Sequence, residues 1–523
     1  IDDEIKKGAK AIICNKKLKK KHTVPIILVK DIKKILAYAC SKFYKHKPKN
    51  IIAVTGTNGK SSVAEFFRQI LVLNKISVAS IGTLGIKKNK KIKKINLTSP
   101  DIITLHRELE ILKKSNIDNV IIEASSHGLQ QGRLDNIDFK AGIFTNFSQD
   151  HLDYHKTMKN YFNSKKILFS RLLKKKNYLI SDAEINEFKA LKQISKKKKL
   201  KILTINKRKI IDNLSLINLI GSFQIKNLCM AILAANVCGL KLNRIKSTLN
   251  RIVSVDGRLQ LTRTLSNKTK IFIDYAHTPD ALLMAVKTLK EYYGENINLV
   301  FGCGGERDIK KRPLMAKIAN KYCKKVYITD DNPRNENPKK IRRLLINNIA
   351  RSKVIEIPNR TKCIQSVIQN SKPLEVILIA GKGHETIQDY GIKKLNISDK
   401  RIVNKTKFKQ KKITYKELNY EWNSEIIQKI MNKKNTFKFQ GVSINSKNVK
   451  KNNLFIAVKG KKKDGHNYLP QAIKRGASYC VVSKKLKNIK TKKLIKCINT
   501  NNFLRTLAMH KRIKSKAKIV AIT

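Results

Sequence analysis

The 523-residue sequence predicts a multidomain α/β protein with parallel sheets, and three observations support this fold class. The chain is longer than one hydrophobic core usually supports, which indicates three or four domains. Short apolar segments alternate with helical stretches, the pattern of parallel strands joined by helices. At 51–62 an apolar segment runs through a glycine turn into a helical stretch, as in a strand–loop–helix unit.

Six apolar segments are the expected strands of these sheets. They are VIIEA at 120–124, AGIFT at 141–145, IFIDY at 271–275, NLVFG at 298–302, KVYIT at 325–329 and VILIAG at 376–381. Their alternation with helical stretches favours parallel α/β sheets. The Lys-rich stretch from Asn404 to Lys412 predicts a linker into a further unit.

An internal repeat divides the chain into two tandem units. EIKKGAKAIIC at 4–14 is echoed by AIKRGASYCVV at 472–482, and IIAVT at 51–55 by KIVAIT at 518–523. Gly8 to Thr55 and Gly476 to Thr523 have the same spacing, so the two units are offset by 468 residues. We expect the first unit to begin inside its first domain, and the chain to be a window on a longer, fused polypeptide.

The composition is that of a soluble globular protein, with 41% hydrophobic and 29% charged residues. No apolar run reaches the roughly eighteen residues that span a bilayer, so no membrane anchor or membrane partner is expected. The nine cysteines show no C-x-x-C and no histidine-paired metal spacing. They predict buried thiols in a reducing compartment, and therefore a cytoplasmic protein.

The net charge of +76, taken alone, suggests a nucleic-acid partner. The basic residues are mostly lysines spread through every segment, without interleaved stacking aromatics. We therefore favour a solvated lysine surface and expect no specific nucleic acid. A basic, nucleic-acid-binding P-loop protein remains the alternative from another functional class, and it predicts steeply salt-dependent DNA binding.

The strongest motif is IIAVTGTNGKSS at 51–62. Glycines let backbone amides approach phosphate oxygens, and a helix N-terminus adds partial positive charge. Lys60 can bridge phosphates and Ser61 can ligate Mg²⁺, although Val54 stands where the strict phosphate-loop pattern has its first glycine. The expected nucleotide-binding residues of this loop are Gly56, Thr57, Asn58, Gly59, Lys60, Ser61 and Ser62.

TGTNGKS resembles the nucleotide loop shared by Mur ligases and folylpolyglutamate synthetases, and further Mur-like segments follow in order. IIEASSHGLQQGR at 121–133 is similar to the family's segment with a magnesium-binding glutamate, and TNFSQDHLDYH at 145–155 to the segment with a metal-binding histidine. The resemblance implies ATP and two Mg²⁺ ions, with Glu123 and His151 joining Ser61 as metal ligands. Mg²⁺ prefers oxygen ligands, so the histidine rests on the resemblance alone.

YFNSKKILF at 161–169 resembles the segment in which the family has a carbamylated lysine, whose carbamate can hold a second Mg²⁺. The resemblance implies Lys165 as this metal ligand, with the adjacent Lys166 as the open alternative. The candidate catalytic residues are then Lys60, Glu123, His151 and Lys165. GSFQIKN at 221–227 resembles the family's adenine-side element and implies Asn227 as a base contact, and a capped helix N-terminus is the alternative.

The resemblance also implies how the two substrates are joined. Family members transfer the γ-phosphoryl group of ATP to a carboxylate, and an amine then displaces the phosphate, which needs positioning and charge neutralisation. A UDP-N-acetylmuramoyl dipeptide would be held by Thr98, Ser99, Ser125, Gln131 and Arg133. A surface-loop or capping role for Thr98 and Ser99 is the alternative.

VDGRLQ at 255–260 and DYAHTPDAL at 274–282 resemble the start of the family's third domain, with Asp256 in place of the usual proline. They imply Arg258, Asp274 and His277 on the ATP side.

TDDNPRNENP at 329–338 contains D-N-P-R, the family's signature for meso-diaminopimelate. A guanidinium can grip a carboxylate bidentately while an aspartate accepts from an ammonium group. The residues implied for this amino acid are Arg307, Asp331, Asn332, Pro333, Arg334, Gly381 and Glu385. A proline-stabilised turn is the structural alternative. Asn359 stands where the family more often has Asp before an arginine, which would weaken an ion pair between segments.

From about Lys412 the chain resembles the N-terminal UDP-binding domain of the family's D-alanyl-D-alanine-adding ligase. Ser443, Asn445, Ser446 and Lys447 would meet the nucleotide there, with a solvent-exposed hairpin as the alternative. The expected domains are a truncated N-terminal UDP-substrate domain at 1–47, a central P-loop ATPase domain with a parallel sheet at 48–257, a C-terminal Rossmann-like domain at 258–405, and the N-terminal domain of a second, fused Mur ligase at 412–523.

Taken together, the resemblance implies an ATP-dependent acid–amino-acid ligase that adds meso-diaminopimelate to UDP-N-acetylmuramoyl dipeptide in peptidoglycan synthesis. A folylpolyglutamate synthetase-like ligase is the nearest alternative, and the segments DNPR and SSHGL speak against it.

Overall fold

The computed structural model describes residues 1–17, 22–88, 91–206, 219–408, 439, 441–460, 463–484 and 493–514. The chain divides into two compact units, which are described separately. The first contains residues 1–260, 275–281 and 306–312, and the second contains 261–274, 282–305 and 313–523. In the part of the chain that the structure describes, no helix is both long and apolar enough to cross a bilayer.

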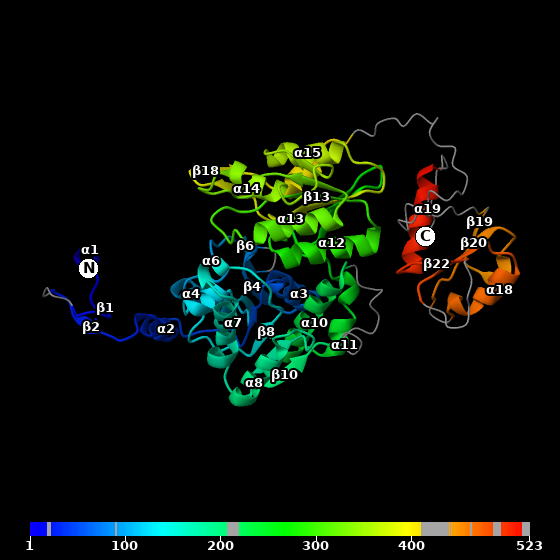
Figure 1. Cartoon of the computed structure of the whole chain (residues 1–523). Helices are drawn as coiled ribbons and strands as arrows, with labels where there is room; N and C mark the ends of the chain where they lie inside the picture. The colour runs from blue at the N-terminus through cyan, green and yellow to red at the C-terminus, as the bar shows by residue number, and fades with distance from the viewer. Residues whose placement is uncertain are drawn as a thin grey trace. The chain divides into compact units, whose positions relative to one another are not determined.

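The first unit is built on an eight-stranded sheet with the order β10-β9-β8-β3-β7-β4-β5-β6. Figure 1 labels four of its strands, β4, β6, β8 and β10. The strands from β10 to β4 are parallel, and β5 and β6 are added antiparallel at one edge. The strands are β3 (Asn50–Thr55), β4 (Val78–Gly82), β5 (Gly85–Lys88), β6 (Lys91–Lys93), β7 (Asn119–Glu123), β8 (Ala141–Phe144), β9 (Tyr178–Ser181) and β10 (Lys201–Thr204).

Helices cover both faces of this sheet, because its central strands have apolar residues at successive positions. Ile52 and Val54 of β3 belong to one buried core with α3 and α10, whereas Ile51 and Ala53 belong to a second core with α4 and α8. The helices of this unit are α1 (Asp2–Lys6), α2 (Ile32–Phe43), α3 (Lys60–Leu73), α4 (Ile102–Lys114), α5 (Ser126–Gln130), α6 (Leu152–His155), α7 (Met158–Ile167), the π-helix η1 (Leu168–Leu172), α8 (Phe188–Lys198), α10 (Ser222–Val237), α11 (Leu242–Lys246) and the 3₁₀ turn η3 (Leu249–Arg251).

The second unit contains a six-stranded sheet with the order β11-β12-β16-β13-β14-β15, in which the strands from β12 to β15 are parallel. The strands are β11 (Gln260–Thr264), β12 (Lys270–Asp274), β13 (Ile297–Phe301), β14 (Lys325–Ile328), β15 (Val354–Glu356) and β16 (Val376–Ala380), followed by the hairpin β17 (Ile387–Tyr390) and β18 (Lys393–Asn396). The helices are α12 (Pro279–Tyr293), α13 (Lys311–Tyr322), α14 (Pro338–Ile346), α15 (Arg360–Gln369) and α16 (Asp399–Lys405). All six expected strands are confirmed, as β7, β8, β12, β13, β14 and β16.

The expected linker is wrong at its start, because Asn404 and Lys405 form the last turn of α16. This short helix is anchored by tertiary contacts that composition does not reveal: Val403 is buried, and Asp399 pairs with Arg360 at 2.7 Å with both side chains fully buried. Residues 409–412 of the expected linker lie outside the described residues.

Asn359 is the N-cap of α15, and its side-chain oxygen accepts a hydrogen bond from the Lys362 amide at 2.9 Å. The expected weakening of an ion pair is therefore wrong, because the neighbouring Arg360 takes its carboxylate partner from Asp399. Asparagine caps a helix about as well as aspartate, so the position tolerates the change.

The C-terminal segment forms a separate four-stranded parallel sheet with the order β19-β20-β21-β22. Its elements are β19 (Gly441–Ser443), the 3₁₀ turns η5 (Ser446–Asn448) and η6 (Gly465–Tyr468), β20 (Asn453–Ile456), α18 (Leu469–Lys474), β21 (Tyr479–Val482), β22 (Leu494–Lys496) and α19 (Thr500–Lys514). The alternative of a hairpin at Ser443–Lys447 is wrong, because β19 and β20 pair in parallel.

The structure reproduces the sequence repeat at the level of single hydrogen bonds. Gly8 and Gly476 have φ values of 97° and 96°, and the amide after each donates to the carbonyl five residues earlier, at 3.0 and 3.1 Å. β1 (Ile12–Cys14) pairs in parallel with β2 (Ile26–Leu28), as β21 pairs with β22, and each equivalent residue is 468 positions further along. Residues 518–523, the last part of the repeat, lie outside the described residues.

Candidate active site

The glycine loop joins β3 to α3 at the carboxyl end of the sheet, between the ends of β7 and β8. Ligands of open α/β sheets bind at this edge. Gly56 (φ 144°) and Gly59 (φ 86°) are required for different reasons: a Cβ on Gly56 would collide with the Thr145 hydroxyl, and one on Gly59 would lie 2.6 Å from Asn227 Oδ1. The loop is therefore packed too closely for any side chain at these two positions.

The segment after β8 holds this loop in shape. The Thr145 hydroxyl donates to the Asn58 carbonyl at 2.6 Å, and the Asn58 amide donates to Asn146 Oδ1 at 2.9 Å. Thr57 and Ser148 exchange two hydrogen bonds, at 3.1 and 3.0 Å. Sequence reasoning missed these braces, although all three partners lie in the Mur-like segment TNFSQDHLDYH.

Lys60 is the first residue of α3 and folds back over the loop. Its ammonium donates to the carbonyls of Gly56 and Thr57 at 2.9 and 2.8 Å. Burial of the ammonium lowers the pKa of Lys60, while Glu123 and Asp150 oppose that effect. The cation therefore sits where a phosphate bound to the loop would meet it.

Ser61, in the first turn of α3, meets Glu123, the last residue of β7, because β3 and β7 are neighbouring strands. The Ser61 hydroxyl donates to Glu123 Oε2 at 3.0 Å and accepts from Arg258 Nη2 at 3.2 Å. Glu123 also accepts from the amide of Thr83 at 2.9 Å and from its hydroxyl at 3.1 Å. Thr83 was not expected from the sequence, but it follows β4, the strand beside β7, and so ends at the same edge. Ser62, the next residue of α3, is buried.

His151 has a left-handed backbone (φ 55°) and lies beside Asp150, with Nε2 3.4 Å from Asp150 Oδ2. The same carboxylate lies 3.5 Å from His277 Nε2 and 3.6 Å from the Lys311 ammonium. Burial lowers the pKa of His151 to about 3, more than Asp150 raises it. Burial would raise the pKa of Asp150, but the His277 hydrogen bond and the charges of His151, His277 and Lys311 hold it well below its usual range. Asp150 thus links the expected residues His151 and His277, a role the sequence reasoning missed.

Lys165 is 1% exposed, and its amine donates to the Gly56 carbonyl at 2.8 Å. The amine also lies 4.3 Å from the centre of the Tyr161 ring. Burial, reinforced by the charge of Lys60, lowers the pKa of Lys165 well below its usual range. Lys166 instead lies over the Phe162 ring at 5.1 Å and is half-buried. Of the two candidate lysines, only Lys165 touches the phosphate loop.

The expected metal ligands fall into two groups. Ser61 and Glu123 are hydrogen-bonded to each other, whereas His151 pairs with Asp150. Within the described ranges, no group of three or more His, Cys, Asp or Glu side chains could hold a metal ion.

Thr98 and Ser99 contact two different residues near the metal site, Thr83 and Glu123. The Thr98 hydroxyl is 3.1 Å from the Thr83 hydroxyl, and the fully buried Ser99 donates to the Glu123 main-chain carbonyl at 2.8 Å. The cap of the following helix α4 is Asp101. The capping alternative for Thr98 and Ser99 is therefore wrong.

Ser125, Gln131 and Arg133 form one cluster with Ser99. The Ser125 hydroxyl caps α5 and lies 3.0 Å from the Ser99 hydroxyl. Arg133 donates to the Ser99 carbonyl at 2.9 Å through Nη1 and to Gln131 Oε1 through Nη2. The structure thus joins four of the five residues expected to hold the acceptor through Ser99, and the fifth, Thr98, contacts Thr83.

Asn227 is buried in α10, against Gly59 of the phosphate loop. The helix has Gly221 as its N-cap without a side-chain cap hydrogen bond, so the capping alternative is not observed there. Gln224 donates to the Arg258 carbonyl at 3.0 Å and so joins α10 to the segment before the second unit.

In the second unit, the loop after β14 contains Asp331, Asn332 and Arg334. Asp331 is buried and packs against Gly381, where a Cβ would collide with its carboxylate; burial raises the pKa of Asp331. Asn332 donates to Glu385 Oε2 at 2.9 Å and accepts from the Lys382 ammonium at 3.0 Å.

Lys382 bonds both Asn332 and Glu385, and sequence reasoning missed this residue. Its ammonium is fully buried and also reaches Glu385 at 3.1 Å. Burial would raise the pKa of Glu385, but Lys382 and the Asn332 hydrogen bond lower it. Lys382 stands inside AGKGHE, between two expected residues, and this position was a usable signal.

Arg334 has a left-handed backbone (φ 52°) and donates to the Gly305 carbonyl at 2.6 Å. The Glu336 amide donates to the Pro333 carbonyl at 3.1 Å, so the turn alternative for this segment is also present. Arg307 belongs to a segment of the first unit, and Asp274 ends β12 in the second. The predicted positions of Arg307 beside diaminopimelate and of Asp274 beside ATP stay predictions.

Comparison with known proteins agrees with this architecture. The family model described as Mur ligase middle domain matches residues 54–235, the one described as Mur ligase, glutamate ligase domain matches 257–383, and the one described as Mur ligase family, catalytic domain matches 438–512. The chain is similar to the UDP-N-acetylmuramoyl-L-alanyl-D-glutamate–2,6-diaminopimelate ligase of Rickettsia bellii, with 40% identity over 77% of this chain and 89% of that protein. The ligase of the same name from Chelativorans sp. is 34% identical over 76% of this chain and 86% of that protein.

Solved structures of related ligases are similar to this chain as well. A structure of a ligase of that name has a TM-score of 0.54 and 28% identity, over 77% of this chain and 88% of that one. A Mycobacterium tuberculosis folylpolyglutamate synthase complexed with ADP has a TM-score of 0.56 at 15% identity, over 67% and 92%, and shares the fold alone. With relatives at 40% identity across most of its length and three matching domains, the chain belongs to the Mur ligase family.

Proposed function

We propose that the chain is an ATP-dependent ligase that joins meso-2,6-diaminopimelate to the D-glutamate carboxylate of UDP-N-acetylmuramoyl-L-alanyl-D-glutamate. The observation that carries the proposal is a phosphate loop with its serine bonded to a carboxylate, in a chain 40% identical to a ligase of that name. The reaction would serve peptidoglycan synthesis in the cytoplasm.

The chemistry follows from the weakness of a carboxylate as an electrophile. A carboxylate oxygen of the dipeptide attacks the γ-phosphorus of ATP, the bond from that phosphorus to the bridging oxygen breaks, and ADP leaves. The amine of diaminopimelate then attacks the acyl carbon, the carbon–oxygen bond to phosphate breaks, and the nitrogen loses a proton. Both steps concentrate negative charge on phosphate oxygens, so cations fixed beforehand are the main requirement.

Lys60 and Arg258 are the cations we assign to the phosphates. Lys60 lies over the loop at 2.9 Å from the Gly56 carbonyl, and Arg258 reaches Ser61 at 3.2 Å. His277 belongs beside them, since it meets the carboxylate of Asp150 within the same unit. Asn227, packed on Gly59, is assigned to the adenine side.

Ser61 and Glu123 fit a magnesium ion. Two oxygens bound to one Mg²⁺ at right angles, each about 2.1 Å away, are about 3 Å apart, and the Ser61 and Glu123 oxygens are separated by 3.0 Å. When bound, the ion would neutralise phosphate charge. His151 is assigned to the same metal centre on resemblance, and its lowered pKa keeps the imidazole neutral, as a metal ligand must be.

Lys165 is assigned as the carbamylated lysine. Its buried amine has a lowered pKa, so it is available uncharged, and an uncharged amine can add to carbon dioxide with loss of one proton. The contact with the Gly56 carbonyl would place the resulting anion beside the phosphate loop. Lys166, turned toward Phe162, lacks that position.

The amino-acid site is assigned to the loop after β14. Asp331, Asn332, Arg334, Gly381 and Glu385 combine carboxylates and a guanidinium at one end of the second sheet, which suits a substrate with ammonium and carboxylate groups at its far end. Thr98, Ser99, Ser125, Gln131 and Arg133 are assigned to the dipeptide.

One assay separates this function from its alternatives. ADP release is measured with the UDP-muramoyl dipeptide and diaminopimelate, lysine or glutamate in turn, and with a folate acceptor and glutamate. We expect turnover with diaminopimelate and the dipeptide. Turnover with folate and glutamate would assign the chain to folylpolyglutamate synthesis instead. Phosphate release stimulated by DNA would assign it to the nucleic-acid class.

We propose further that residues 412–523 are the N-terminal domain of a second, fused Mur ligase unit, resembling the D-alanyl-D-alanine-adding enzyme. The family match at 438–512 and the shared hydrogen bonds of the repeat support this reading. Binding of the UDP-muramoyl tripeptide to the whole chain tests it, as a second binding event beside that of the tripeptide as product at the diaminopimelate-adding site. An Asn445→Ala change, beside the Ser443 hydroxyl, should weaken that binding but leave diaminopimelate ligation unchanged. Tripeptide binding that the change leaves intact would refute the assignment.

A further inference from the structure

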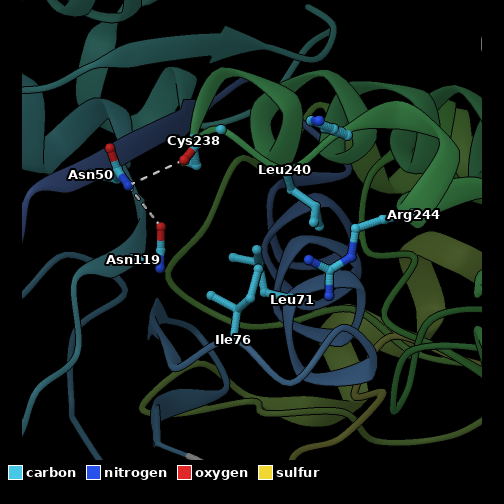
Figure 2. Close-up of a pocket in the computed structure, with 9 residues that line it drawn as sticks. Asn50, Leu71, Ile76, Asn119, Cys238, Leu240 and Arg244 are labelled. Carbon is cyan, nitrogen blue, oxygen red and sulfur yellow. Dashed lines mark hydrogen bonds between the residues drawn. The ribbon is translucent and has the colours of Figure 1, made fainter.

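A cavity of about 380 Å³ opens at the amino ends of β3 and β7, the opposite end of these strands from the phosphate loop (Figure 2). Asn50 and Asn119, the first residues of the two strands, line it, and the side-chain Nδ2 of Asn50 donates to Asn119 Oδ1 at 2.9 Å. Leu71 and Leu240 form an apolar wall, 1% and 4% exposed. None of the residues assigned to the proposed reaction lines this cavity.

The opening of the cavity is cationic. Lys241 and Arg244 are exposed there, and in the described part of the chain neither side chain has a carboxylate partner. Figure 2 shows the Arg244 guanidinium turned toward Leu71 and Leu240. Gly239 lies between the end of α10 and the start of α11. A Cβ on Gly239 would meet no atom within 4 Å, so the space beside it is open.

These features define one class of ligand. The volume lies at the small end of ligand pockets, about 300–1,000 Å³, and suits a single ring or a short chain. A guanidinium pairs with a carboxylate through two parallel hydrogen bonds, and the leucine wall favours an apolar body. We propose that this cavity binds a small carboxylate with an apolar body.

The position of the cavity gives such binding a consequence. Each of the four elements around it has a residue of the candidate nucleotide site toward its other end. In each pair below, the first residue lines the cavity and the second belongs to the candidate nucleotide site. The pairs are Asn50 and Gly56 for β3 and its following loop, Leu71 and Lys60 for α3, Asn119 and Glu123 for β7, and Cys238 and Asn227 for α10. Strands and helices packed in one core move as stiff bodies, so an occupant that shifts their near ends changes the geometry at the far ends. A carboxylate whose binding shifts these near ends alters nucleotide affinity, and nucleotide then alters carboxylate affinity by the same factor.

The first experiment tests binding alone, on the full chain by calorimetry, with benzoate, acetate and benzyl alcohol as probes. Benzoate has both the charge and the ring, acetate has only the charge, and benzyl alcohol has only the ring. We expect saturable binding of benzoate alone. Arg244→Gln should weaken it about tenfold, the effect of losing one charged pair of about 1.4 kcal/mol. Ile76→Phe, which fills the cavity, should abolish it without lowering the melting temperature.

The matched control is Arg107→Gln, an exposed arginine of α4 that does not line the cavity. Equal loss of benzoate binding in both arginine variants would mean attraction by the general positive charge, and would overturn the proposal. Absence of saturable benzoate binding to the wild-type chain would overturn it as well.

The second experiment tests the coupling, which rests on the proposed function. The dissociation constant of a non-hydrolysable ATP analogue is measured with and without saturating benzoate. We expect a change of at least about fivefold, the low end of typical coupling, and no change in Ile76→Phe, which no longer binds benzoate. Unaltered analogue affinity alongside intact benzoate binding would refute the coupling. A wild-type chain that binds no analogue at all would refute the proposed function and leave the cavity assignment standing.

Discussion

Replacing Arg334 by alanine should weaken diaminopimelate far more than ATP. Hydrogen bonds to charged groups contribute about 1.5–3 kcal/mol each, so losing a two-bond grip on a carboxylate costs about 3 kcal/mol or more. That corresponds to a rise of roughly a hundredfold or more in the KM for diaminopimelate. The guanidinium also donates to the Gly305 carbonyl at 2.6 Å, so the substitution removes this charged donor too, at a cost of about 1.5 kcal/mol of stability.

The assay is ADP release against diaminopimelate concentration at saturating ATP and dipeptide, repeated against ATP concentration. The KM of Arg334→Lys for diaminopimelate should fall between those of the wild type and Arg334→Ala, because an ammonium keeps the charge but cannot form two parallel hydrogen bonds to a carboxylate. Arg343→Ala is the matched control, since Arg343 is exposed on α14 of the same unit. A KM for ATP that rises as much as that for diaminopimelate, or lysine as the better wild-type substrate, would refute the assignment of the loop after β14.

Three further changes test other parts of the molecule. Lys60→Ala should reduce ATP-dependent turnover about 10²- to 10³-fold with the fold intact by circular dichroism, as for other fixed donors of charge; wild-type turnover would remove Lys60 from the reaction. Lys165→Ala should abolish ligation, and depleting carbon dioxide should slow the wild type, whereas Lys166→Ala should behave like wild type; the reverse pattern would move the assignment to Lys166. His106 is fully buried, which lowers its pKa from 6.5 to about 4 although it bonds the Asp135 carbonyl at 3.1 Å. The unfolded chain therefore takes up the proton first, so stability is full above about pH 6.5 and falls by up to about 3 kcal/mol toward pH 4. Urea unfolding at pH 7 and pH 5 should show a smaller loss for His106→Gln than for wild type, and identical losses would contradict this origin.

The phosphate loop could be predicted from sequence because all its determinants are local. A strand, two glycines and a helix start lie within 51–62, and each glycine is required by a contact that excludes a side chain. The contacts of Glu123, which meets this segment at Ser61, are not local. Thr83 meets Glu123 only because β4 lies beside β7, and that strand order is a property of the sheet rather than of either segment.

The role of Asp150 was missed for a similar reason. Its carboxylate is shared by His151, His277 and Lys311, which come from three segments far apart in the chain. No spacing rule joins such residues. Only folding the segments 275–281 and 306–312 into the first unit creates the cluster.

The choice between Lys165 and Lys166 shows where periodicity helps and where it stops. Neighbouring residues on a helix point about 100° apart, so the two lysines must face different surroundings. Each lies over the aromatic ring four residues earlier, Tyr161 or Phe162, as helical spacing requires. Which of these two faces of α7 meets the phosphate loop depends on how the helix packs, and the sequence does not encode that locally.

The repeat survives in structure because few residues determine it. Gly8 and Gly476 end their helices with φ near 97°, a conformation that L side chains rarely adopt. That single turn sets the hydrogen bond back to the helix and the direction of the strand that follows. The strand then needs only three apolar or small residues to pair in parallel at the same register, as Ile12 does with Ile26 and Cys480 with Leu494. Elsewhere the two copies can diverge freely, since lysine or asparagine on the solvent side changes neither the turn nor the pairing. A short echo in sequence therefore predicted a longer correspondence in structure.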